Sequence, residues 1–153
     1  MTQIGAMAPD FTLPRDGGDS VTLSELRPSK VVLYFYPKDD TPGCTKQAIT
    51  FTEHLQAFKD AGCEIIGISK DTVAKHDKFR DKHTLGVILA SDADDDVCER
   101  YGVWKEKNMY GKTYMGIERS TFLIGEDGKI LQDWRKVRVP GHVEAVLEAV
   151  QSA

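Results

Sequence analysis

Uninterrupted hydrophobic runs alternate with amphipathic stretches along the first half of the chain. Residues 31–36 are all apolar or aromatic and end at a proline, which is typical of a central parallel strand. Residues 63–69 form a second, mostly apolar run and predict another buried strand. Between the two runs, hydrophobic side chains recur at helical spacing and predict a helix over residues 41–61, ended by Gly62. Its inward positions are Ala48, Phe51, Leu55 and Phe58.

Shorter elements follow the second run. A helix capped by Asp71 is expected to extend to about residue 83, and residues 87–89 predict a short strand. Asp92 is expected to cap a further helix, which Gly102 ends.

Two hairpins and a final helix complete the pattern. Residues 11–13 and 21–23 predict an N-terminal hairpin. Residues 120–124 and 129–134 predict another hairpin across a Glu-Asp-Gly turn. Residues 142–149 predict an amphipathic helix that closes the chain.

The order of these elements predicts an α/β, thioredoxin-like fold. Its parallel strands, later hairpin and final helix give a central mixed sheet flanked by helices, with an N-terminal hairpin in addition. Residues 105–117 follow neither period and are expected to form a long loop. No repeat or linker interrupts the chain, so residues 1–153 are expected to form a single domain.

Composition and charge narrow the function classes. The 153 residues are 41% hydrophobic with a net charge of −4, which argues against nucleic acid as the main partner. No export signal and no apolar run near the length of a membrane span is seen, so no membrane partner is expected. Three widely spaced cysteines do not form a disulfide framework. We therefore expect a reducing, cytoplasmic location, where a cysteine is more often catalytic than structural.

One cysteine is distinguished by its place at a helix start. Thr41 suits the N-cap and Pro42 the first helical position, which puts Cys44 at the third. A glutamate often occupies that third position, so an anion is favoured there. Unpaired backbone N–H groups and the helix dipole stabilise a thiolate over a thiol. The sequence therefore predicts one activated cysteine.

The neighbouring residues decide between two kinds of thiol chemistry. Thioredoxin-type oxidoreductases carry Cys-x-x-Cys at this junction, whereas this chain has Thr41 in place of the first thiol. Dithiol exchange within the motif is therefore excluded. A single thiolate beside a hydroxyl suits attack on an electrophile such as a peroxide. That attack places negative charge on the departing oxygen, so the site also requires fixed donors and a cation.

Several motifs resemble those of one enzyme family. Residues 37–44 match the Pro-x-x-x-Thr-x-x-Cys motif of peroxiredoxins, and the longer string 36–45 resembles the bacterioferritin comigratory protein, or peroxiredoxin Q, subgroup. Residues 8–11, 101–104 and 116–122 resemble the same subgroup, so the similarity extends over nearly the whole chain. The resemblance implies thiol-dependent reduction of hydrogen peroxide and organic hydroperoxides, without a cofactor.

The resemblance also implies roles for four residues. Cys44 is the peroxidatic nucleophile, which peroxide oxidises to a sulfenic acid. The Thr41 hydroxyl hydrogen-bonds the thiolate and the peroxide oxygen. Pro37 shields the site from bulk water, and Arg119 supplies the cation. Thioredoxin, glutaredoxin or a small thiol is the implied electron donor, and the subgroup favours a monomer.

The chain departs from the subgroup in its second cysteine. Similar proteins carry a resolving thiol at one of two positions, which are Ile49 and Arg80 in this sequence. Cys63 opens a buried strand and is expected to be structural. Cys98 is favoured as a core residue, but it is the first alternative candidate for a resolving thiol. We therefore predict that an external thiol regenerates Cys44.

Other features leave alternatives open. The four histidines have no metal-ligand spacing, so no metal is predicted. Residues 135–138 are interpreted as a solvated edge, or less favourably as a docking patch for an acidic reductant. Met109, Tyr110 and Tyr114 either line a pocket mouth for hydrophobic hydroperoxides or cover the core.

Two other functions compete with the peroxidase. One is a non-catalytic thioredoxin-like module, acting as a redox sensor or chaperone, which would not need Pro37, Thr41, Cys44 and Arg119 together. The other is a glutathione-peroxidase-like enzyme, which is disfavoured because its Gln and Trp motifs are absent.

Overall fold

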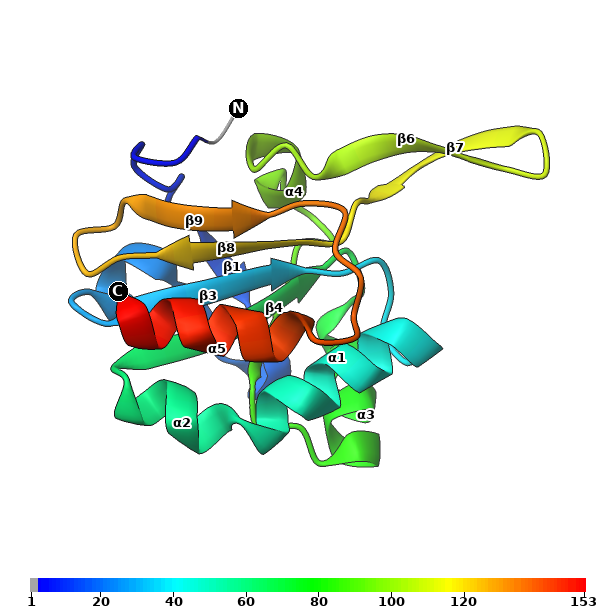
Figure 1. Ribbon diagram of the computed structural model, residues 1–153. Helices are drawn as coiled ribbons and strands as arrows, with labels where there is room; N and C mark the ends of the chain where they lie inside the picture. The colour runs from blue at the N-terminus through cyan, green and yellow to red at the C-terminus, as the bar shows by residue number, and fades with distance from the viewer. Residues whose placement is uncertain (1–2) are drawn as a thin grey trace.

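A mixed five-stranded sheet forms the centre of the molecule (Figure 1). The computed structural model describes residues 3–153. The strands lie in the order β5-β4-β3-β8-β9, with β3, β4 and β5 parallel and the other two antiparallel to their neighbours. They are β3 (Lys30–Phe35), β4 (Cys63–Ser69), β5 (Ile88–Ser91), β8 (Ser120–Ile124) and β9 (Ile130–Trp134).

Helices cover the two faces of this sheet unequally. One face packs against α1 (Pro42–Glu53), α2 (Leu55–Asp60), α3 (Val73–His83) and α5 (His142–Ser152). The other face packs against α4 (Val97–Arg100) and the N-terminal hairpin of β1 (Thr12–Pro14) and β2 (Ser20–Thr22). Short 3-10 turns follow β1 and β2, at Asp16–Gly18 and Leu23–Leu26. Within residues 3–153, no helix has the length and apolar character to cross a membrane.

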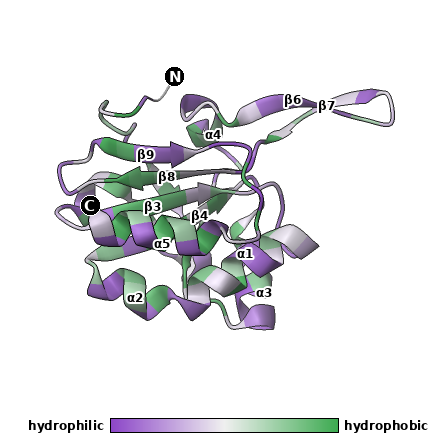
Figure 2. Ribbon diagram, viewed as in Figure 1, coloured by the Kyte–Doolittle hydropathy of each residue, from purple (hydrophilic) through white to green (hydrophobic). Residues whose placement is uncertain are grey.

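The sheet divides the interior into two hydrophobic cores. Along β3, Val32 and Tyr34 face the core beneath α1 and α5, whereas Leu33 and Phe35 face the core beneath α4. Both faces of β3 are therefore buried, which explains why its sequence is apolar without alternation. Figure 2 shows hydrophobic residues on the central strands and hydrophilic residues over much of the outer helix surfaces.

The expected fold class is confirmed: the chain is an α/β protein with a central mixed sheet flanked by helices and an N-terminal hairpin. The expectation of a long loop over residues 105–117 is wrong. Two paired strands, β6 (Trp104–Met109) and β7 (Lys112–Ile117), form a hairpin arm that projects from the body (Figure 1). Most of the arm is exposed, so no burial pattern marks it in the sequence. Its two-residue turn places Tyr110 and Gly111 at φ 53° and 77°, as a tight hairpin requires.

Three helix boundaries also differ from expectation. The helix expected over residues 41–61 is two helices, which divide at His54, where φ and ψ are −98° and 6°. Thr72, not Asp71, caps α3 and accepts a hydrogen bond from the backbone N–H of Lys75. Asp92 lies five residues before α4, yet its carboxylate still accepts from the first N–H groups of that helix.

Candidate active site

The end of β3 leads directly into the first turn of α1. Thr41 is extended, and the first helical hydrogen bond runs from the N–H of Thr45 to the Thr41 carbonyl oxygen. The N–H groups of Gly43 and Cys44 precede this bond and are available to an anion. The Cys44 side chain points inward with Ala48 and is only 2% exposed. The structure therefore places Cys44 at the helix position that the sequence predicts.

Arg119 supplies a cation to the sulfur. It lies in the short connection between β7 and β8, 75 residues after Cys44. Its Nη2 donates to Cys44 Sγ at 3.2 Å, and its carbonyl oxygen accepts from the N–H of Val137 at 2.9 Å. Arg119 is thus held both at its backbone and at its guanidinium group.

Gly43 makes room for this guanidinium. A Cβ atom at position 43 would lie 3.2 Å from Arg119 Nη2 and 3.9 Å from Val139. Any side chain there would press on the group that contacts the sulfur.

Gln47 is a site residue that sequence reasoning missed. Its side chain is fully buried, and its Oε1 accepts from Arg119 Nη1 at 2.6 Å. Arginine only donates, so the amide nitrogen of Gln47 must point elsewhere, and it has no partner within residues 3–153. The signal that could have revealed it is its position three residues after Cys44, a polar residue on the buried face of α1.

Thr41 and Pro37 are near the cysteine in the chain, but within residues 3–153 neither forms a hydrogen bond with its sulfur. The Thr41 hydroxyl donates to the Lys38 carbonyl oxygen at 2.9 Å, so it neither caps α1 nor bonds to Cys44. Pro37 is exposed at the end of β3.

A buried polar network anchors the loop that carries Thr41. Asp39 accepts from the Tyr36 hydroxyl at 2.5 Å through one carboxylate oxygen and contacts His76 Nδ1 at 2.6 Å through the other. His76 Nε2 faces the Ala90 carbonyl oxygen at 3.0 Å. Both ring nitrogens of His76 therefore face oxygen atoms.

Further contacts tie the same loop to its neighbours. The N–H of Asp39 donates to the Asp71 carboxylate at 2.8 Å, and that carboxylate also accepts from the Ser69 hydroxyl. Asp40 forms ion pairs with Lys82 and His83 at the end of α3. Because the loop is bonded to β4 and α3, the start of α1 has a fixed position.

The other two cysteines lie far from this site. Cys98 is fully buried in the core on the opposite face of the sheet. Cys63 shares the core of Cys44 but pairs with Lys30, at the far end of β3. Six strand residues separate the two ends, which is roughly 17–20 Å. The structure does not bring either thiol to Cys44.

The environments of these two thiols differ from that of Cys44. Burial raises the pKa of Cys63 to about 12. Burial, together with the neighbouring Asp92 carboxylate, raises the pKa of Cys98 well above its ordinary value. Both side chains are therefore neutral thiols at neutral pH.

Two titratable groups near Arg119 are depressed in pKa. Burial and, second, the Arg119 charge lower the pKa of His142 to about 4, and its Nε2 lies 2.8 Å from the Thr121 hydroxyl. The same two causes lower the pKa of Lys107 on the arm. Arg119 therefore lies close enough to both groups to disfavour a second positive charge on either.

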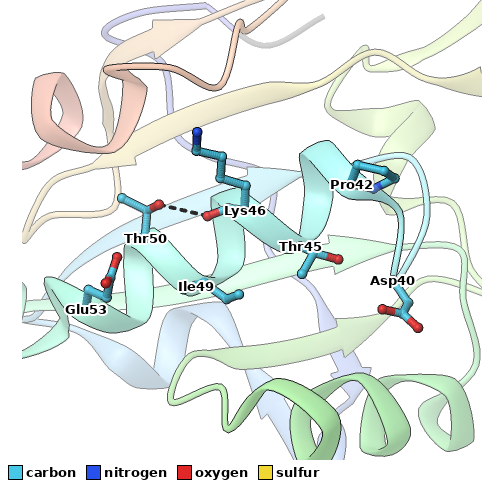
Figure 3. A pocket seen from close by; sticks show the side chains of 7 residues that line it. All are labelled: Asp40, Pro42, Thr45, Lys46, Ile49, Thr50 and Glu53. Carbon is cyan, nitrogen blue, oxygen red and sulfur yellow. Dashed lines mark hydrogen bonds between the residues drawn. The ribbon is translucent and has the colours of Figure 1, made fainter.

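A shallow groove of about 500 Å³ runs along the outer face of α1 (Figure 3). Its lining residues are Asp40, Pro42, Thr45, Lys46, Ile49, Thr50 and Glu53. Cys44 is not among them, because its side chain points to the inner face of the helix. Ile49, one of the two positions considered for a resolving thiol, therefore opens to this groove rather than to the sulfur. No group of three or more potential metal ligands occurs within the described part of the chain.

Comparison with known families gives one consistent result. A profile described as the AhpC/TSA family matches residues 4–132. Peroxiredoxin Bcp of Bacillus subtilis is 46% identical over 149 residues, covering 97% of this chain and 95% of that protein. Peroxiredoxin Bcp of Escherichia coli K12 is 43% identical over 143 residues, with coverages of 94% and 92%.

Solved structures agree with the sequence matches. The bacterioferritin comigratory protein of Xanthomonas campestris, studied for its alkyl peroxide reduction activity, superposes with a TM-score of 0.91 at 44% identity. The comparison covers 99% of this chain and 97% of that one. A peroxiredoxin Q variant from Xylella fastidiosa gives a TM-score of 0.94 at 39% identity, with coverages of 99% and 97%.

Proposed function

The chain belongs to the AhpC/TSA family of peroxiredoxins and is a thiol-dependent peroxidase, and from that premise we propose that Cys44 is the residue that peroxide oxidises. The observation that carries the proposal is the 3.2 Å contact between Arg119 Nη2 and Cys44 Sγ at the start of α1. Within residues 3–153, Cys44 is the only cysteine with a cation within hydrogen-bonding distance of its sulfur.

In the proposed reaction the Cys44 thiolate attacks one oxygen of the peroxide. A sulfur–oxygen bond forms while the oxygen–oxygen bond breaks, so Cys44 becomes a sulfenic acid. The departing alkoxide, or hydroxide from hydrogen peroxide, takes up a proton from water. Arg119 and the free N–H groups of the first α1 turn stabilise the negative charge as it moves from sulfur to oxygen.

Thr41 and Pro37 have supporting roles in this proposal. Once substrate enters, the Thr41 hydroxyl exchanges its bond with Lys38 for one with the thiolate or the peroxide. Pro37 contributes a backbone without an N–H group at the end of β3 and restricts the loop.

We also propose that an external thiol regenerates Cys44. The two other cysteines are buried at the opposite end or on the opposite face of the sheet, which supports an external donor such as thioredoxin, glutaredoxin or a small thiol. A disulfide requires Cα atoms within about 7 Å of each other. Subgroup similarity supports a monomer, and sedimentation of the reduced protein tests that state.

Stopped-flow measurement of Cys44 oxidation tests the assignment. Cys44→Ser should abolish peroxide consumption, whereas Cys63→Ser should retain most of it. Arg119→Ala should slow oxidation at least tenfold, because losing one donor to a developing oxyanion typically costs about 2.7–4 kcal/mol. Equal losses in the two cysteine variants, with both folded, would refute the assignment of Cys44.

A further inference from the structure

Six cationic side chains lie on α1, on the β6–β7 arm and on residues 135–141, which are three parts of the chain that adjoin the site. They are Lys46, Lys105, Lys107, Lys112, Lys136 and Arg138, and we call them the cationic rim. Within residues 3–153 none of them forms an ion pair with a carboxylate. The Glu118 carboxylate acts on Lys107 without forming an ion pair with it. The whole chain has a net charge of −4, so the residues outside the rim are together strongly negative.

The strand register places three rim residues on one face of the β6–β7 arm. Lys107 pairs with Tyr114, and Lys105 and Lys112 occupy the same face by alternation. Arg119 and Cys44 lie close enough to Lys107 to affect its pKa, so Lys107 connects this face of the arm to the site. Glu106 lies on the opposite face of the arm.

A second segment adds cations on the other side of Cys44. Residues 135–141 link β9 to α5 and pass beside the start of α1 (Figure 1). Val137 bonds to the Arg119 carbonyl, and Val139 lies next to Gly43. Lys136 and Arg138 are exposed, whereas the valines that alternate with them are half-buried. The two cations are therefore on the outside of a segment that contacts the site.

The arm also carries apolar side chains that nothing in the described chain covers. Tyr110 at its turn is 97% exposed, and Met109 and Met115 are each about half exposed. Six residues per strand give the arm a length of about 20 Å. A small thiol at Cys44 cannot contact its tip, whereas a protein can contact the tip and the sulfur together. Aromatic and methionine side chains beside cations are typical of protein interfaces.

We propose that the cationic rim and the exposed arm form the docking surface for an acidic protein dithiol that reduces oxidised Cys44. This inference rests on the proposed function and adds the class of reductant. The charge of the rim selects a partner of negative surface charge and speeds the encounter. The arm provides the apolar contacts that keep the partner in place.

The reduction balances in two steps. One partner thiolate attacks the sulfenic sulfur of Cys44, forming a mixed disulfide and releasing the oxygen as water. The second partner thiol attacks the partner sulfur of that bond, which releases Cys44 as a thiol. Cys44 gains two electrons, and the partner leaves as an intramolecular disulfide.

The test compares reductants after one equivalent of hydrogen peroxide has oxidised Cys44. The probes are a reduced thioredoxin of acidic isoelectric point and dithiothreitol, each followed by stopped flow. The thioredoxin rate should fall about tenfold between about 20 mM and 300 mM salt, because screening shortens the reach of surface charge. The dithiothreitol rate should not change.

Two double variants locate the surface. Lys136→Glu with Arg138→Glu should slow reduction by thioredoxin about tenfold and weaken its salt dependence. Lys59→Glu with Lys129→Glu is the matched control, because these exposed cations lie on α2 and in the β8–β9 turn. Thioredoxin should reduce oxidised Cys44 of the control variant at nearly the wild-type rate. Tyr110→Ser should slow reduction by thioredoxin at every salt concentration.

Three results would overturn the docking proposal while leaving the peroxidase intact. The first is an equal loss in both double variants, the second is a salt-independent thioredoxin rate, and the third is an equal loss with dithiothreitol. Sedimentation of the wild type as a dimer that the rim variant dissociates would assign the surface to a second copy instead. Failure of peroxide to oxidise Cys44 in the first step would contradict the proposed function itself.

Discussion

At the scale of single residues, one turn of α1 and one arginine form the proposed reactive centre. Gly43 leaves space for the guanidinium of Arg119. The Nη2 of this group donates to Cys44 Sγ, and its Nη1 donates to Gln47 Oε1. Gln47 is neutral, so it orients Arg119 without cancelling the positive charge that the thiolate requires.

Gln47 is therefore expected to act as a positioning residue. Gln47→Leu removes the acceptor, so Arg119 loses its orientation and Cys44 oxidation should slow about tenfold, as for the loss of a hydrogen bond to a charged group. Gln47→Glu keeps the acceptor but adds a negative charge, which should move the pH profile of oxidation to higher pH. A Leu variant with the wild-type rate, or a Glu variant with the wild-type profile, would show that Gln47 only fills space.

At the scale of elements, the loop between β3 and α1 is held by buried charges. Asp39→Asn removes the carboxylate that faces Tyr36 and His76. Breaking such a buried pair should lower the free energy of unfolding by about 3 kcal/mol, measured by urea denaturation. Asp40→Asn, which affects exposed ion pairs at the end of α3, is the matched control and should change stability little.

The start of α5 gives the fold a dependence on pH. His142 has a pKa of about 4 when folded, lowered by burial and by Arg119, against about 6.5 when unfolded. Between these values only the unfolded chain binds the extra proton, so stability falls as the pH is lowered from about 6.5 to 4. The contribution should be up to about 2 kcal/mol after solvent screening. Urea denaturation of His142→Gln should show a flatter profile in this range, and identical slopes would contradict the assignment.

The elements also show which features the sequence could reveal. The continuous apolar runs of β3 and β4 and the cap-and-proline start of α1 were predictable, because burial and helix ends have local signatures. The β6–β7 arm was not, because its exposed faces need no hydrophobic alternation. The contacts of Thr41 and Gln47 were also missed, since each depends on a partner, Lys38 or Arg119, whose position only the folded chain defines.

At the scale of the whole molecule, the three thiols are kept apart: Cys98 lies across the sheet from Cys44, and Cys63 lies at the far end of β3. Treatment with one equivalent of hydrogen peroxide and a sulfenic-acid trap should label Cys44 and leave Cys63 and Cys98 reduced, as mapped by peptide mass spectrometry. The reason is that the thiols lie across the sheet or at its far end. Rapid, nearly complete formation of a Cys44–Cys98 disulfide within a monomer would show that the fold opens enough for the two cysteines to meet. Cys98 would then be the resolving residue.

Under the proposed regeneration by an external thiol, this separation determines how long the sulfenic acid of Cys44 persists. Without a neighbouring thiol in the chain, the sulfenic acid reacts either with an external reductant or with a second peroxide molecule. The second peroxide converts it to a sulfinic acid, which ordinary thiols do not reverse. The supply of reductant relative to peroxide therefore determines the working lifetime of each molecule. The fraction of permanently inactivated molecules should therefore rise with the excess of peroxide over reductant.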